Sequence, residues 1–177
     1  MTIFLYIVLF IVLLVIVLIL VAPRKYDVRR SIIVNRPLSE TFQYLKLIRN
    51  QDHWSPWKKK DPNMKQTQTG IDGEIGFINR WEGNKDVGIG EQELIGYVDN
   101  ERIDSELRFF KPWKSVSNGY FLVKEIEPGK TEVTWGFEGT NPRPFNVFML
   151  FFNMDKTVGK DFDEGLASLK LELEKKI

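Results

Sequence analysis

The segment MDKTVGKDFDEGLASLK, from Met154 to Lys170, predicts a long amphipathic helix near the C-terminal end of the chain. Two glycines, Gly159 and Gly165, interrupt it, and each costs a helix about 1 kcal/mol relative to alanine. We therefore expect either a group that approaches this helix closely or a space kept open beside it. Apolar residues form one stripe along the helix, at spacings of four, four, four, three and four: Met154, Val158, Phe162, Leu166, Leu169 and Leu173.

The region from Gly70 to Gly139 supplies the surface that this helix could cover. Val133, Trp135 and Phe137 alternate with polar residues, so one face of that strand is apolar. Short turns between the strands favour an antiparallel meander with one solvated face. The predicted strands are GEIGFINRWEG (73–83), VGIGEQELIGYV (87–98), RIDSELRFF (102–110), SVSNGYFLVKEIE (115–127) and TEVTWGFEG (131–139).

Three shorter segments precede this region. YDVRRSIIV, residues 26–34, predicts a strand because it is rich in β-branched residues and ends at a turn signal. PLSETFQYLKLIRN, residues 37–50, predicts a helix with Ser39 as the N-cap. HWSPW, residues 53–57, then predicts a loop stiffened by its proline.

The first residues predict a membrane anchor. Ile3 to Ala22 contains no charge and would span about 30 Å as a helix, the thickness of a hydrocarbon core. A signal peptide would instead have a basic start and small residues before a cleavage site, which this segment lacks. We expect residues 1–23 to form a single-pass anchor and residues 24–177 to form one domain. Basic residues at 24, 25, 29 and 30 predict that this domain is cytoplasmic.

Composition excludes several functions. The chain has 25 basic and 24 acidic residues, which argues against a nucleic-acid-binding protein. With no cysteine and one histidine, it cannot form a thiolate site or a multi-histidine metal site within one chain. We predict no cofactor, and the sequence leaves the oligomeric state open.

The segments WSPW, GFINRWEG, VGIGE, TEVTWGFEG and MDKTVGKDFDEGLASLK together resemble the START-like SRPBCC superfamily, described as polyketide cyclase/dehydrase and lipid-transport-like. The resemblance covers residues 24–175 and is nearest to bacterial members with an N-terminal membrane helix. It implies an α+β helix-grip fold, in which a curved antiparallel sheet wraps around a long C-terminal helix. It also implies a cavity between them that binds a lipid, isoprenoid or polyketide-like molecule.

We expect this cavity to be lined by aromatic residues together with a few polar ones. The chain has 13 phenylalanines, 5 tryptophans and 5 tyrosines, although core packing alone would account for several of them. The candidates are Trp54, Trp57, Trp81, Glu82, Glu91, Phe109, Tyr120, Trp135, Phe137, Val158 and Phe162.

Two alternatives to simple binding stay open. A cyclase, dehydratase or isomerase would use Glu82 or Glu91 as an acid or base, if burial raised the pKa of that carboxyl. A protein-interaction module would show a filled core and an exposed apolar patch. His53 and Ser55 are interpreted as loop residues, because the sequence offers no third catalytic partner or G-x-S-x-G motif. FNVFMLFF, residues 145–152, predicts a lid, a packing segment or a surface that touches the bilayer.

Overall fold

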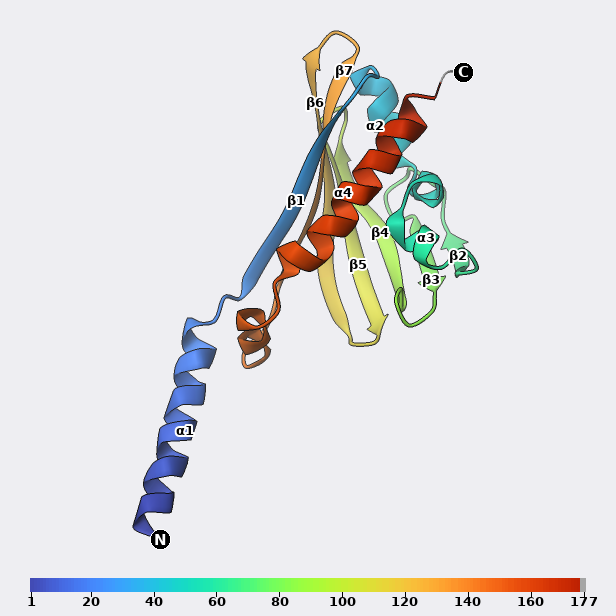
Figure 1. The fold of residues 1–177 in the computed structure, drawn as a ribbon. Helices are drawn as coiled ribbons and strands as arrows, with labels where there is room; N and C mark the ends of the chain where they lie inside the picture. The colour runs from blue at the N-terminus through green and yellow to red at the C-terminus, as the bar shows by residue number, and fades with distance from the viewer. Residues whose placement is uncertain (176–177) are drawn as a thin grey trace.

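The computed structural model describes residues 1–175, so the last two residues of the predicted domain, 176–177, lie outside the described residues. Within this range the chain forms a curved antiparallel sheet, a long C-terminal helix on its inner face, and an N-terminal helix that extends away from the domain (Figure 1). The helices are α1 (Thr2–Val21), α2 (Leu38–Lys46), η1 (Ile48–His53), α3 (Pro56–Lys60), η2 (Phe145–Leu150) and α4 (Met154–Leu173). The strands are β1 (Lys25–Val34), β2 (Lys65–Thr69), β3 (Ile78–Glu82), β4 (Ile89–Val98), β5 (Arg102–Lys111), β6 (Ser115–Glu127) and β7 (Lys130–Thr140).

The seven strands lie in the order β1-β7-β6-β5-β4-β3-β2. The strands β3 to β7 form the predicted meander, β2 extends it by pairing antiparallel with β3, and β1 joins the other edge by pairing antiparallel with β7. The prediction of an α+β chain with a curved antiparallel sheet, a C-terminal helix and a preceding apolar helix is confirmed. This arrangement is consistent with a helix-grip fold.

Three details of the sequence interpretation differ from the structure. The strand β2 was not predicted, because its sequence KQTQT carries no apolar residue that would show an alternating pattern. Ser39 is not an N-cap, since α2 begins at Leu38 and Pro37 occupies the cap position without a side-chain hydrogen bond. The loop expected at residues 53–57 is shorter than predicted, because α3 begins at Pro56, a favourable first residue of a helix.

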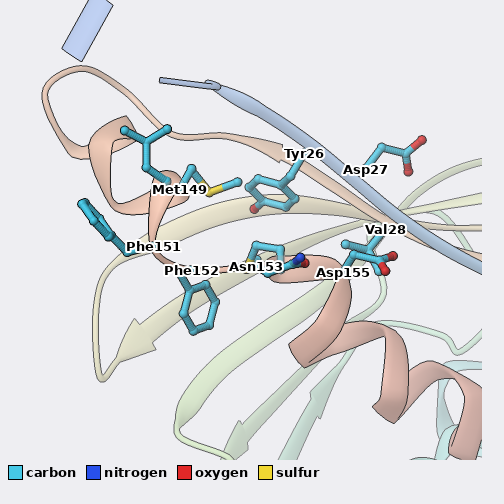
Figure 2. Close-up of a pocket in the computed structure, with 10 residues that line it drawn as sticks. Tyr26, Asp27, Val28, Met149, Phe151, Phe152, Asn153 and Asp155 are labelled. Atoms are coloured by element: carbon cyan, nitrogen blue, oxygen red, sulfur yellow. The ribbon is translucent and has the colours of Figure 1, made fainter. Parts of the chain in front are cut away.

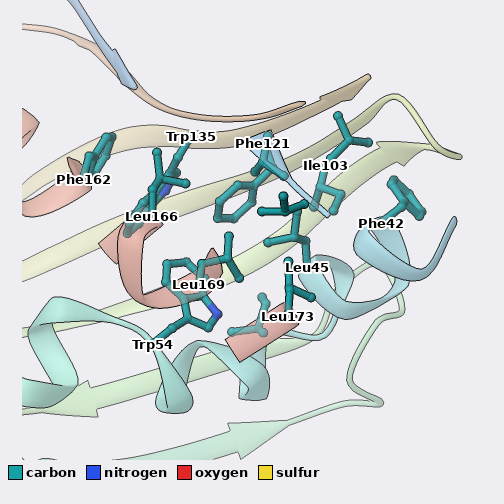
Figure 3. Close-up of a cluster of buried hydrophobic side chains, with 14 of the residues drawn as sticks. Phe42, Leu45, Trp54, Ile103, Phe121, Trp135, Phe162, Leu166, Leu169 and Leu173 are labelled. Carbon is teal, nitrogen blue, oxygen red and sulfur yellow. The ribbon is translucent and has the colours of Figure 1, made fainter. Parts of the chain in front are cut away.

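The hydrophobic core lies between the sheet and the C-terminal half of α4 (Figure 3). The rings of Trp135 and Phe162 stack with centroids 4.1 Å apart, and Trp54 meets Trp135 edge to face at 5.0 Å. Leu166 and Leu169 continue the predicted stripe of α4 and are buried. This end of the domain is therefore filled by side chains.

The two glycines of α4 lie where the sheet approaches the helix. Gly159 faces the guanidinium group of Arg30, and Gly165 faces Trp135 and Pro56. Arg30 in turn pairs with Asp155 at 2.8 Å and Asp163 at 3.3 Å, which fastens the edge strand β1 to α4. Close approach of neighbouring groups, one of the two explanations expected from the sequence, accounts for both glycines.

The helix α1 is long and apolar enough to cross a membrane, and none of its residues is buried. Only residues 22–24 separate it from β1.

Candidate functional site

A row of aromatic side chains crosses the inner face of the sheet, the face that carries Trp135 and meets α4. Tyr26 of β1 lies 5.5 Å from Phe137 of β7, measured between ring centroids. Phe137 lies 6.3 Å from Phe109 of β5, and Phe109 lies 5.9 Å from Trp81 of β3. These four side chains are half-buried, unlike the fully covered core around Trp54. The row is therefore an apolar wall that the chain itself covers only in part.

Two glycines let these rings lie flat against the backbone. A Cβ atom on Gly90 would come within 2.5 Å of the Trp81 ring, and one on Gly139 within 2.2 Å of the Tyr26 hydroxyl oxygen. Real side chains never approach so closely, so any larger residue at these positions would displace the rings. These two glycines therefore shape the wall.

Amide and hydroxyl groups lie among the aromatic residues on the same face. Asn79 pairs in register with Gln92 of the next strand, and Gln92 Nε2 donates to Ser105 Oγ at 3.2 Å. The hydroxyls of Tyr26 and Ser117 share a hydrogen bond of 2.7 Å. Burial raises the pKa of Tyr26 above its ordinary value, although the hydrogen bond with Ser117 lowers it in part. The Tyr26 hydroxyl therefore keeps its proton at neutral pH and can donate it in a hydrogen bond.

Asn79 is the least satisfied of these polar residues. Its side chain is only 8% exposed, and its Oδ1 atom has no hydrogen-bond partner among the described residues. Leaving a buried acceptor unpaired costs about 1–3 kcal/mol. An acceptor of this kind on an aromatic wall is a natural partner for a hydroxyl or amide of a bound molecule.

A pocket of about 350 Å³ opens at the end of the row nearest α1 (Figure 2). It lies between the start of β1, the η2 region and the start of α4. Tyr26 belongs both to this pocket and to the aromatic row, so the two features meet at its ring. The pocket is lined by Tyr26, Asp27, Val28, Met149, Leu150, Phe151, Phe152, Asn153, Met154 and Asp155.

The other aromatic candidates belong mainly to the core. Trp54 is 1% exposed and contacts Phe121 and Trp135, so it faces the core. Trp57 is half-buried and meets Trp135 and Phe162 edge to face at 5.5 and 6.2 Å. Trp57 therefore lies at the border between the packed core and the more open end of the inner face. Val158 is half-buried and packs against the same core.

Three of the predicted cavity residues lie on the outer face of the sheet. Glu82 directly follows the inward Trp81, and neighbouring residues of a strand point to opposite faces. Its carboxylate pairs with Arg80 at the surface at 3.2 Å. Glu91 pairs with Arg108 at 2.6 Å, on the same outer face. The prediction that these two carboxylates could project into the cavity is therefore wrong.

Tyr120 is the third of these residues. Its hydroxyl donates to Asp27 at 2.9 Å, and the guanidinium group of Arg102 covers its ring at 4.7 Å. Tyr120 is only 5% exposed, because neighbours on the outer face cover it. The inner face of β6 carries Ser117, Gly119 and Phe121 instead. Tyr120 thus stabilises the sheet from outside.

The structure adds Tyr26, Asn79, Gln92 and Ser117 to the inner-face set. Strand alternation carries a signal for Asn79, which lies two residues before Trp81 in the predicted strand 73–83. Tyr26 and Ser117 come together from strands 91 positions apart in the chain, so only the pairing of β1, β7 and β6 unites them. Among residues 1–175, no group of three His, Cys, Asp or Glu side chains is arranged to hold a metal ion.

Comparisons with known proteins agree on the architecture. A protein from Chromobacterium violaceum superposes with a TM-score of 0.60 at 10% identity, covering 85% of this chain and 98% of its own. The Aha1 protein from Colwellia psychrerythraea, solved as a dimer, gives a TM-score of 0.54 at 15% identity, covering 85% and 97%. DynU16, a protein of the dynemicin biosynthetic locus, gives 0.57 at 13% identity, covering 84% of this chain and 47% of its own.

No protein-family model and no curated protein matches the sequence itself. At these identities the structural likeness shows the fold alone.

Proposed function

We propose that this protein is anchored in a membrane by α1 and binds a hydrophobic small molecule, such as a lipid, isoprenoid or polyketide-like compound, between the inner face of the sheet and α4. The observation that carries this proposal is the juxtaposition of a half-buried aromatic row with the buried, unpaired Oδ1 of Asn79. A typical small-molecule site combines an apolar wall with a few placed polar groups.

The aromatic row supplies the driving force. Covering a large apolar side chain completely is worth about 1.5–3 kcal/mol relative to leaving it exposed. Trp81, Phe109 and Phe137 are only partly covered by the chain, so a bound apolar molecule would remove further apolar surface from water. At this end of the inner face the ligand would cover the sheet, as core side chains do at the other end of the domain.

The polar groups supply orientation. Asn79 offers an acceptor, and the pair of Tyr26 and Ser117 offers hydroxyls at the end of the row near the pocket. A ligand with a hydroxyl or amide N–H at one end would donate to Asn79 Oδ1 and leave its hydrocarbon part on the aromatic row. A hydrogen bond from the ligand to this buried acceptor would remove the free-energy cost of leaving it unpaired in the empty site.

The position of α1 favours a ligand that dissolves in membranes. The pocket beside Tyr26 opens next to the C-terminal end of α1, where the chain would leave the bilayer. A molecule concentrated in the membrane would therefore be present at high local concentration beside the pocket. In this proposal the domain is cytoplasmic, as the basic residues after α1 predict.

Binding without chemistry is the simpler form of this proposal. The enzyme alternative depended on Glu82 or Glu91, and both lie on the outer face in surface ion pairs. The inner face instead presents amides and hydroxyls, which hold a ligand more readily than they transfer protons at neutral pH.

The test uses the full chain purified in mild detergent or lipid nanodiscs. Bound small molecules are released by organic extraction and identified by mass spectrometry, and the Asn79→Leu variant is compared with the wild-type chain. Leucine has nearly the same size as asparagine but cannot accept a hydrogen bond. The matched control is Asn118→Leu, the same change at an exposed position on the outer face.

We expect the wild-type and Asn118→Leu chains to carry the same compound and the Asn79→Leu chain to carry much less of it. A wild-type chain that yields only bulk lipid, in the proportions of the surrounding membrane or nanodisc, would contradict the proposal. Equal amounts of bound compound in all three chains would show that Asn79 does not bind the ligand.

A further inference from the structure

The segment 142–152, which contains η2, exposes an unusual amount of apolar surface. Five of its large apolar side chains are between 42% and 81% exposed: Phe145, Phe148, Leu150, Phe151 and Phe152. Soluble proteins seldom leave such a cluster facing water, and a patch of this kind marks an interaction surface. Leucine and four phenylalanines without an interspersed charge match a lipid surface well.

Side chains of the same segment cap the C-terminal end of α1 by donating hydrogen bonds to its backbone carbonyl groups. Asn146 is fully buried, and its Nδ2 donates to the carbonyl oxygens of Ile19 at 2.8 Å and Ala22 at 3.0 Å. Arg143 Nη2 donates to the carbonyl oxygen of Leu20 at 3.3 Å. The last carbonyl groups of a helix have no partner within the helix, and at membrane depth an unpaired carbonyl costs several kcal/mol. The segment therefore belongs structurally to the end of α1.

These hydrogen bonds fix the level of the segment relative to a bilayer. The apolar run of α1 ends at Val21, so the boundary between acyl chains and headgroups lies near the residues that Asn146 caps. The exposed phenylalanines lie beside that boundary. Arg24 and Lys25 follow this boundary in the chain, and the hydrogen bond to Leu20 holds Arg143 beside it. These basic side chains suit the headgroup region, where they meet lipid phosphates.

A second element lies at the same end of the domain. Figure 1 shows that the turn between β5 and β6 is on the side from which α1 departs, as is the η2 region. This turn exposes Trp113, at 65%, between Lys111 and Lys114. Tryptophan and lysine are the residue types that gather at membrane interfaces.

We propose that the segment 142–152 is a second membrane-binding element, which inserts its phenylalanines into the interface of the bilayer that α1 spans. Trp113 and its neighbouring lysines form a further contact with the same surface. The inference rests on the proposed function only in taking α1 as a membrane span, and it does not depend on a ligand.

The consequence concerns the pocket. Five consecutive residues of the pocket lining, Met149 to Asn153, belong to or directly follow the proposed membrane-binding segment. Figure 2 shows the Met149 side chain extending toward Tyr26 and the Phe151 ring pointing away from it. With the segment embedded in the interface, the pocket opens at the bilayer surface and away from bulk water. Insertion therefore orients the domain so that a membrane-dissolved molecule can reach the inner face.

The experiment uses single cysteine variants of the full chain, which has no cysteine of its own. An environment-sensitive fluorophore is attached at Phe151→Cys, Trp113→Cys, Leu13→Cys or Glu125→Cys, and each protein is reconstituted in phosphatidylcholine–phosphatidylglycerol vesicles. Quenching is measured with lipids that carry a nitroxide either near the headgroup or deep in the acyl chain. Position 13 reports on α1, and position 125, on the β6 strand near the opposite end of the domain, is the matched control.

We expect the probe at 13 to be quenched by the deep nitroxide and the probes at 151 and 113 by the shallow one, whereas the probe at 125 is quenched by neither. If the probe at 13 is quenched but the probe at 151 is no more quenched than the probe at 125, the inference is overturned, whereas the proposal that α1 spans the membrane is supported. A blue-shifted probe at 151 without nitroxide quenching also overturns it, because protein then covers the segment. If position 13 is not quenched either, the proposed membrane anchoring itself fails.

Discussion

Trp135 and Gly165 touch so closely that a Cβ atom on residue 165 would lie 2.7 Å from Cζ3 of the Trp135 ring. The contact joins the middle of β7 to the middle of α4, and Cδ of Pro56 lies 3.0 Å from the same Cβ position. The stacking of Trp135 on Phe162 depends on this approach, so the glycine sets the distance between the helix and the sheet.

The change Gly165→Ala should destabilise the protein. The added methyl group meets a ring and a proline that are both held by the core, and overpacking of this kind costs about 1–3 kcal/mol. The gain in helix propensity, about 1 kcal/mol, offsets only part of that cost. Thermal or urea unfolding measures the difference.

Gly159→Ala is the matched control in the same helix. Its Cβ would meet the guanidinium group of Arg30, which is the end of a flexible side chain and can move aside. The exposed ion pairs of Arg30 with Asp155 and Asp163 would weaken, but the gain in helix propensity compensates. We expect a change within about 0.5 kcal/mol of zero, and equal destabilisation by both alanines would contradict this account.

Asn79→Leu should stabilise the empty protein while weakening ligand binding. The substitution removes a buried acceptor that has no partner among residues 1–175 and adds apolar contact, a gain of about 1–2 kcal/mol. Opposite effects on stability and on binding are typical of a functional residue. Unfolding of the delipidated chain measures the first effect, and a decrease in stability would show that Asn79 serves packing.

Tyr120→Phe should destabilise the protein at neutral pH by about 1–2 kcal/mol, because the hydrogen bond to the Asp27 carboxylate is lost. Burial, followed by that hydrogen bond, raises the pKa of Tyr120 to about 12. A folded-state pKa above the unfolded value near 10 means that this contribution is complete below pH 10 and disappears as the pH rises through 12.

The pH dependence gives a direct measurement of this effect. The stability difference between wild type and Tyr120→Phe should shrink between pH 10 and pH 12. Tyr44→Phe is the control, since burial also raises the pKa of Tyr44 to about 12 while its hydroxyl has no hydrogen-bond partner among the described residues. Tyr44→Phe should not destabilise the protein at pH 7, and a loss equal to that of Tyr120→Phe would contradict the assignment.

Glu82→Gln and Glu91→Gln should leave ligand occupancy unchanged, because both side chains lie on the outer face. Glu91 is one of three carboxylates around Arg108, together with Glu93 and Glu106, so its loss should cost about 0.5–1 kcal/mol. Extraction and mass spectrometry of the two variants check the first expectation. A large decrease in bound compound for either variant would show that the substituted carboxylate takes part in ligand binding.

The sequence predicted the order of most elements because their apolar periodicity is strong. The stripe from Met154 to Leu173 became α4 with the expected limits, and the alternation of Val133, Trp135 and Phe137 gave the inner face of β7. The strand β2 escaped prediction because hydrogen bonds to β3, rather than apolar burial, hold its polar residues.

The faces of the strands were harder to predict than their positions. In β4, irregularities between Ile89 and Gly90 and between Leu94 and Gly96 shift the alternation. Strict alternation would group Glu91 with Ile89, Ile95 and Tyr97, whereas the structure groups it with the outer face. In β6 both faces carry apolar residues, so the pattern alone could not assign Tyr120 to the outside.

The brevity of the connection between α1 and β1 limits what the domain can do. Three residues, Ala22 to Arg24, span at most about 10 Å when fully extended. A carrier that shuttles its cargo between two membranes needs a tether many times longer. If α1 spans a membrane as proposed, this domain can travel only by diffusing laterally with α1, so a bound ligand would have to pass to an acceptor that comes to the same leaflet.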